Sequence, residues 1–261
     1  MQPIDDLSFE EYKEHQFAEL SQHRLLESAM ALQPSTSYRR NGKGWVPQSY
    51  PGFAVISMVS ENPGNENLPG ILKAIQAHLL EQCPWEDLIY LLPADSFHQT
   101  VANTLSEERF MQHILRPGLE PVYPSLVAEA FSRMPERGTK TLTMRLIGLS
   151  IFGTAVGLLG IFDDEPAYRC IVDFRSTFYD DPMLAALNVC RTRPFIGHIT
   201  LAYLGGELTE GQREDLAAAV HAINRHLETA PPRFRLSLTG LRRFHHLSAF
   251  FREEDYPRYH F

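Results

Sequence analysis

The chain has 261 residues, of which 44% are hydrophobic and 21% charged, as in ordinary globular proteins. This length suits one large domain or two small ones, and either can bury a sizeable core. The formal net charge is −8 at pH 7 and the arginines cluster only as short pairs, which argues against a protein that grips duplex nucleic acid. A small phosphorylated ligand or the end of an RNA fits this charge balance better.

Cysteine usage and the apolar segments indicate the compartment. Cys83, Cys170 and Cys190 have no C-x-x-C spacing, which argues against a disulfide scaffold or a zinc site and for a reducing environment. The first residues are acidic and lack an apolar run, so no secretory signal is expected. The uncharged stretch 146–162 is shorter than the roughly 20 residues that cross a bilayer. We therefore expect a cytoplasmic protein without a membrane segment.

Apolar periodicity and end signals predict a mixture of helices and strands. The first helix is expected over 8–32, with Ser8 as its cap. Residues 33–51 are polar and contain Gly and Pro, which predicts a linker or wrapping loop, in which Trp45 and Tyr50 could stack on a base or anchor the loop to the core. The later elements, in chain order, are a strand at 53–59, a helix at 70–81, strands at 88–92 and 97–105, helices at 106–115 and 124–134, a hairpin of 139–152 and 154–162, a helix at 165–179, a strand at 195–204, a helix at 209–228, and strands at 234–238 and 244–251.

Two of the eleven histidines have a threonine two residues later, inside runs with strand character: Phe97-His98-Gln99-Thr100-Val101 and Gly197-His198-Ile199-Thr200-Leu201. Residues i and i+2 of a strand point the same way, so each run presents an imidazole beside a hydroxyl. An imidazole exchanges protons near neutral pH, and a hydroxyl can donate to a phosphate oxygen. Two such strands facing each other would form a symmetric pocket suited to metal-free cleavage of a phosphoester. The alternative is a pair of core histidines, each bonded to a backbone carbonyl.

The paired H-x-T pattern resembles that of the two-histidine (2H) phosphoesterase superfamily, which includes cyclic nucleotide phosphodiesterases and RNA 2′,5′-ligase-like proteins. The likeness is closest over 195–203, while 92–101 and Tyr50-Pro51-Gly52 resemble an uncharacterised branch of the superfamily. These landmarks extend from about residue 40 to residue 205, with dissimilar segments between them. Gln99 departs from the pattern, which often has an apolar residue there, but that position should face away from the pocket.

The resemblance implies an α+β fold. Two pseudo-symmetric lobes with antiparallel sheets would surround a central groove, and each lobe would contribute one H-x-T strand. This two-lobed domain is expected over 49–261, after an N-terminal helix and wrapping loop over 1–48.

The function expected from these residues is metal-independent hydrolysis of a cyclic phosphodiester, of the 2′,3′-cyclic nucleotide or RNA-end type. One of His98 and His198 would take a proton from water and the other would donate to the leaving oxygen, and spacing leaves open which does which. Thr100 and Thr200 would donate to the non-bridging oxygens of the phosphate. An unperturbed histidine pKa of about 6.5 suits both roles.

The same pattern points to further residues and leaves other functions open. Arg145 and Tyr50 are candidate auxiliary residues, whereas Tyr203, at odd spacing from His198, is expected to face the core. No H-E-x-x-H or carboxylate cluster is present, so neither a metal nor a cofactor is predicted. A protein of the same fold that binds a nucleotide or phosphorylated ligand without turnover is the main alternative. RNA end-joining is a third, against which the acidic charge balance weighs.

Overall fold

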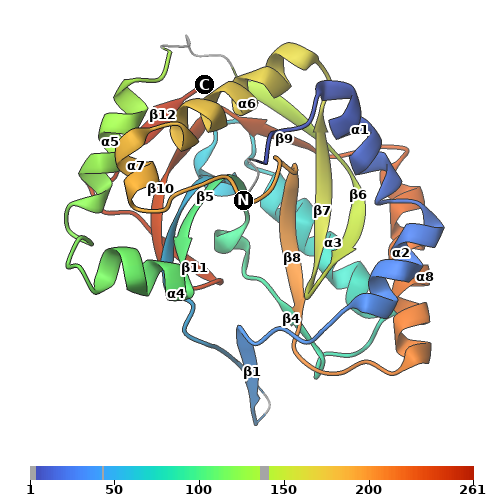
Figure 1. The fold of residues 1–261 in the computed structure, drawn as a ribbon. Helices are drawn as coiled ribbons and strands as arrows, with labels where there is room; N and C mark the ends of the chain where they lie inside the picture. The colour runs from blue at the N-terminus through green and yellow to red at the C-terminus, as the bar shows by residue number, and fades with distance from the viewer. Residues whose placement is uncertain (1–3, 43, 136–140) are drawn as a thin grey trace.

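The computed structural model describes residues 4–42, 44–135 and 141–261. The first three residues of the chain, and the start of the strand predicted at 139–152, lie outside this part. Within it the protein is α+β, with two five-stranded antiparallel sheets side by side and helices around them (Figure 1). This confirms the two-lobed α+β fold expected from the sequence.

The first lobe is built on the sheet that carries the first H-x-T sequence. Its strand order is β11-β10-β3-β5, and β12 also pairs with β10. All seven residues of the central strand β3 are buried. Strands β10 and β5 flank it, the main core covers Phe53 and Val55, and a smaller apolar cluster with Phe244 covers Ala54, Ile56 and Met58. The strands of this lobe are β3 (Gly52–Met58), β5 (His98–Ser106), β10 (Leu238–His246), β11 (Ala249–Phe251) and β12 (Arg258–His260).

The second lobe is built on the sheet with strand order β4-β8-β7-β6-β9. Its strands are β4 (Ile89–Leu91), β6 (Leu142–Phe152), β7 (Ala155–Phe162), β8 (His198–Leu204) and β9 (Arg233–Leu236). The lobes are not the two halves of the chain, because β4 pairs with β8 while β10 returns to pair with β3. This exchange of strands joins both lobes into one body with a shared buried core.

Helices cover the sheets on their outer sides (Figure 1). In the second lobe α2 and α8 pack on β6, and α3 packs on β8. In the first lobe α5 packs on β12, while α6 contacts both β5 and β7 and so bridges the lobes. The helices are α1 (Phe9–Ala18), α2 (Gln22–Ala31), α3 (Leu68–Gln82), α4 (Glu107–Phe110), α5 (Tyr123–Ser132), α6 (Glu165–Tyr179), α7 (Pro182–Ala186) and α8 (Glu210–Leu227), with 3₁₀ turns at Val59–Glu61 and Ala94–Ser96. Across the described ranges, no helix has the length and apolar character to span a bilayer.

The N-terminal region differs from its prediction in two places. The helix expected over 8–32 is divided into α1 and α2, because Ser21 has extended backbone and its hydroxyl accepts from the N–H of Arg24 to start a new helix. The expected loop at 33–51 contains a hairpin of β1 (Tyr38–Asn41) and β2 (Gly44–Pro47), with Gly42 at a φ of +60° in the turn.

The helix expected over 106–115 is also modified. Glu107 has a φ of +49° and its N–H donates to the carbonyl of Pro51, so α4 leaves β5 at a sharp angle. A π-helical turn at Met111–Leu115 follows α4 directly. The bend brings Arg109, on α4, to the wall of the cavity between the lobes.

Candidate functional site

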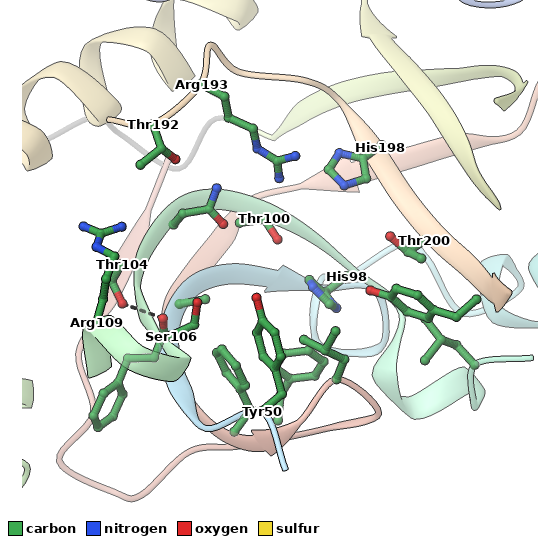
Figure 2. A pocket seen from close by; sticks show the side chains of 18 residues that line it. Tyr50, His98, Thr100, Thr104, Ser106, Arg109, Thr192, Arg193, His198 and Thr200 are labelled. Atoms are coloured by element: carbon green, nitrogen blue, oxygen red, sulfur yellow. Dashed lines mark hydrogen bonds between the residues drawn. The ribbon is translucent and has the colours of Figure 1, made fainter. Parts of the chain in front are cut away.

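The two H-x-T sequences lie in β5 and β8, which we call the motif strands. The motif strands belong to different sheets but contact each other between the lobes. A cavity of about 420 Å³ opens there, and His98, Thr100, His198 and Thr200 all line it (Figure 2). The four side chains predicted to act together are therefore brought together.

The two imidazoles are held in the same way. Nδ1 of His98 lies 2.7 Å from the carbonyl oxygen of Ser96, and Nδ1 of His198 lies 3.0 Å from that of Ile196. A carbonyl only accepts, so each Nδ1 carries the hydrogen and each Nε2 keeps its lone pair for another partner. In both cases the carbonyl belongs to the residue two positions earlier, so the two halves of the site repeat one arrangement.

Each motif strand has a β-bulge directly after its threonine. In β5 the extra residue is Val101, and in β8 it is Leu201. A bulge shifts the alternation of faces by one residue, so Asn103 and Tyr203 join the cavity wall three positions after Thr100 and Thr200. The expectation that Tyr203 faces the core is therefore wrong. Strict two-residue alternation gives no signal for these two positions.

Gln99 lies between the motif strands, fully buried and turned away from the cavity as predicted. Its Nε2 donates to the carbonyls of Thr100, at 2.7 Å, and Ile196, at 3.1 Å. Its Oε1 accepts from the backbone N–H of His198 at 2.6 Å. The carbonyl of Ile196 thus receives both the Gln99 amide and the His198 ring, which couples the first motif strand to the second histidine.

The pKa values of the two imidazoles differ from the value expected from the sequence. Burial lowers the pKa of His98 to about 4. Burial, followed by the charge of Arg193, lowers the pKa of His198 to about 4. Both imidazoles are therefore neutral at pH 7 in the unliganded protein, whereas the sequence alone suggests an unperturbed pKa of about 6.5. A bound anion between them would favour the charged form and raise both pKa values again.

The positive charge of the site comes from arginines that the sequence pattern does not single out. Arg145, a candidate auxiliary residue, does not line the cavity and forms an ion pair with Asp163 at 2.9 Å. Arg109 and Arg193 line the cavity instead. Both lie outside the motif strands, so their place depends on how α4 and the segment before β8 are folded.

The aromatic candidates are divided between the cavity and the core. Tyr50 lines the cavity, with its ring stacked on Phe244 at a centroid distance of 6.3 Å. Trp45 does not line it, because its ring packs against Gly205 and its indole N–H donates to the carbonyl of Glu86. Of the two, Tyr50 is thus the aromatic ring available to a ligand.

The segment that carries Arg193 is held by a buried ion pair. The carboxylate of Asp6 lies 3.0 Å from the Arg175 guanidinium, with side-chain exposures of 1% and 4%. Arg175 also donates to the carbonyl of Arg193 at 2.8 Å, and the N–H of Phe195 donates to Asp6 at 2.5 Å. Residues near the N-terminus therefore position one side of the cavity.

Helix α1 holds the backbone just before His198. Gln16 donates to the carbonyls of Gly160 and Gly197, both at 2.8 Å, and the Tyr12 hydroxyl donates to Gly160 at 2.7 Å. A Cβ at Gly197 would lie 2.3 Å from the Gly160 oxygen, so only glycine fits this close approach.

Comparisons with known proteins show the fold and leave the function open. No protein-family model and no curated protein matches the chain. A solved structure of ATU0111 from Agrobacterium tumefaciens strain C58, a conserved protein of unknown function, is similar with a TM-score of 0.56 and 18% identity, over 84% of this chain and 91% of that one. A structure of TT0787 from Thermus thermophilus matches with a TM-score of 0.42 and 14% identity, over 73% of this chain and 86% of that one. The first of these shows a shared architecture at an identity too low to carry a function.

Proposed function

We propose that the protein is a metal-independent phosphoesterase of the 2H phosphoesterase type that hydrolyses a cyclic phosphodiester. The observation that carries the proposal is the convergence of two H-x-T pairs, from separate sheets, on one cavity. In both pairs a backbone carbonyl binds Nδ1, which leaves Nε2 for proton transfer. The sequence resemblance around both motif strands supports the same class.

The chemistry needs one proton taken and one proton given. A neutral imidazole removes a proton from water, whose oxygen forms the new bond to phosphorus. The second imidazole, protonated, gives its proton to the ribose oxygen as the old phosphorus–oxygen bond breaks. Thr100 and Thr200 donate to the non-bridging oxygens, and Arg193 balances their negative charge. After the reaction the first imidazole carries the proton and the second is neutral, and exchange with solvent after product release restores the starting arrangement.

The low pKa values of His98 and His198 favour one alternative function, in which the protein binds its ligand without cleaving it. A protein with two neutral imidazoles at pH 7 has a base but no acid until an anion binds. If a bound phosphate does not raise either pKa enough, the same cavity would hold a nucleotide or phosphorylated ligand without cleaving it. Turnover distinguishes the two functions.

The proposed substrate is a small phosphorylated molecule or an RNA end, and the proposed compartment is the cytoplasm. A cavity of about 420 Å³ lies in the range of small-molecule sites. Cys83, Cys170 and Cys190 are free thiols, as is usual for proteins of a reducing compartment.

The test is hydrolysis of 2′,3′-cyclic nucleotides with a chelator present, followed by chromatography of the products. His98→Ala and His198→Ala should each lower kcat by about 10²-fold or more, because each removes one proton-transfer group. His23→Ala is the matched control, since His23 lies exposed on α2 and outside the cavity. Turnover that survives both cavity substitutions contradicts the proposal, and tight binding without turnover in the wild type supports the binding protein instead.

A further inference from the structure

The cavity has a second polar end, remote from the catalytic side chains. Figure 2 shows Arg109 and Ser106 on one side of the cavity, and His198 and Thr200 on the other. Asn103 and Thr192 also line the cavity. Guanidinium and hydroxyl groups donate to phosphate oxygens, so the end of the cavity with Arg109 and Ser106 is suited to an anion.

The charge of the lining supports the same conclusion. None of the 18 residues that line the cavity is Asp or Glu, although the whole chain carries a net charge of −8. Two arginines are present, and Arg193 is near enough to His198 to lower its pKa. Arg193 can therefore balance the charge of the phosphate between the histidines, which leaves Arg109 for a different negative group.

The contacts of Arg109 leave part of its guanidinium for a ligand. One terminal nitrogen donates to the carbonyl of Asn188 and lies 3.6 Å from Sγ of Cys190. Within the described part of the chain, no carboxylate lies within ion-pair distance of Arg109. A guanidinium has five N–H donors, so a fork remains that matches two oxygens of a phosphate.

We propose that Arg109 forms a subsite for a second phosphate of the substrate. The inference rests on the proposed function and narrows its substrate class to cyclic phosphodiesters with another phosphate group. The cyclic phosphate would lie between the histidines and the second phosphate at Arg109, with the nucleoside along Tyr50. The second phosphate has two sources, a 5′-phosphate on a mononucleotide or the next internucleotide phosphate of an RNA end.

The experiment compares kcat/KM for adenosine 2′,3′-cyclic phosphate and for its 5′-phosphorylated form. The wild type should prefer the 5′-phosphorylated substrate by about tenfold or more, as for a charge-assisted hydrogen bond. Arg109→Gln should bring this ratio close to one, and Arg109→Lys, which keeps the charge, should retain part of it. Arg116→Gln is the matched control, because Arg116 is exposed directly after the π-helical turn at Met111–Leu115 and lies outside the cavity.

The possible results separate the inference from the proposed function. Hydrolysis of both substrates with a wild-type ratio near one, or a ratio that Arg109→Gln does not change, overturns the subsite and leaves the proposed function intact. A dinucleotide with a terminal cyclic phosphate, assayed in parallel, identifies the source of the second phosphate. A higher kcat/KM for the dinucleotide than for the 5′-phosphorylated mononucleotide indicates an RNA end, and the reverse indicates a mononucleotide. Either result supports the subsite.

If the wild type hydrolyses none of these substrates, the proposed function fails and calorimetry decides the inference. Adenosine 2′,5′-bisphosphate should then bind more tightly than adenosine 2′-monophosphate, by a factor that Arg109→Gln removes. Equal affinities for the two nucleotides overturn the subsite.

Discussion

Replacing Gln99 with methionine tests how the two lobes are coupled. Methionine keeps the length of the side chain but removes all three hydrogen bonds of the amide. The N–H of His198 loses its acceptor, which costs about 1–3 kcal/mol for a buried donor. The carbonyl of Ile196 keeps the His198 ring as a donor, so its loss is smaller. We expect the free energy of unfolding to fall by about 3 kcal/mol in total.

The catalytic effect should exceed what lost stability explains. Without Gln99 the His198 backbone and the carbonyl that holds its ring are free to shift, and small misplacements at a reacting centre reduce rates strongly. We expect kcat for a 2′,3′-cyclic nucleotide to fall by about tenfold or more, well below the unfolding temperature, with a smaller change in KM.

Gln76 provides the matched control. It is equally buried and donates to the carbonyls of Leu92 and Leu201, but touches neither histidine nor its carbonyl. Gln76→Met should lower the free energy of unfolding by about 1–2 kcal/mol, since no N–H loses its acceptor, and should leave kcat unchanged. Urea unfolding and steady-state kinetics measure both effects. Equal kcat values in Gln99→Met and the wild type would refute the positioning role, and unchanged stability would refute the hydrogen-bond reasoning.

The pH profile and the glycine before His198 give two further predictions. Because burial lowers the pKa of His98 and His198 to about 4, the kcat/KM profile of the free enzyme should peak on the acidic side and fall toward neutrality. The bound phosphate raises both pKa values, so the kcat profile should lie at higher pH. A kcat/KM profile with both limbs near neutrality would contradict the lowered pKa values of the two histidines. Gly197→Ala places a Cβ 2.3 Å from the backbone oxygen of Gly160 and should cost about 1–3 kcal/mol in urea unfolding. Gly211→Ala is its control, because the added Cβ would have no atom of another segment within 4 Å. Equal stability of the two variants would argue against the close approach at Gly197.

The motif strands were predictable because their signal is local. His98 and Thr100, or His198 and Thr200, share a face by simple alternation, and that relation holds in the structure. The alternation fails directly after each threonine, at the bulges of Val101 and Leu201. Beyond the bulges, Asn103 and Tyr203 face the cavity, where strict alternation would point them away from it. A bulge depends on pairing with a neighbouring strand, so the sequence of the strand alone does not specify it.

The arginines of the cavity were not predictable because long-range contacts place them. Arg109 reaches the cavity through the bend at Glu107, which pairs with the carbonyl of Pro51. The hairpin within 33–51 was missed for a related reason: its short strands are fixed by the buried ring of Tyr38, which stacks on Tyr90 at 4.1 Å. Glu107 and Pro51, like Tyr38 and Tyr90, are more than 50 positions apart in the sequence, so local sequence patterns do not reveal these contacts.

The N-terminal segment supports the cavity, which limits how far the chain can be truncated without loss of the site. A fragment beginning at residue 49 would lack Asp6, Tyr12 and Gln16 together. The buried guanidinium of Arg175 would then have no carboxylate, a loss of about 3–5 kcal/mol for a broken buried pair. If such a fragment were inactive, the cause could be the lost contacts that position His198. Its inactivity would therefore not show that the protein lacks enzymatic activity, and assays should use residues 1–261.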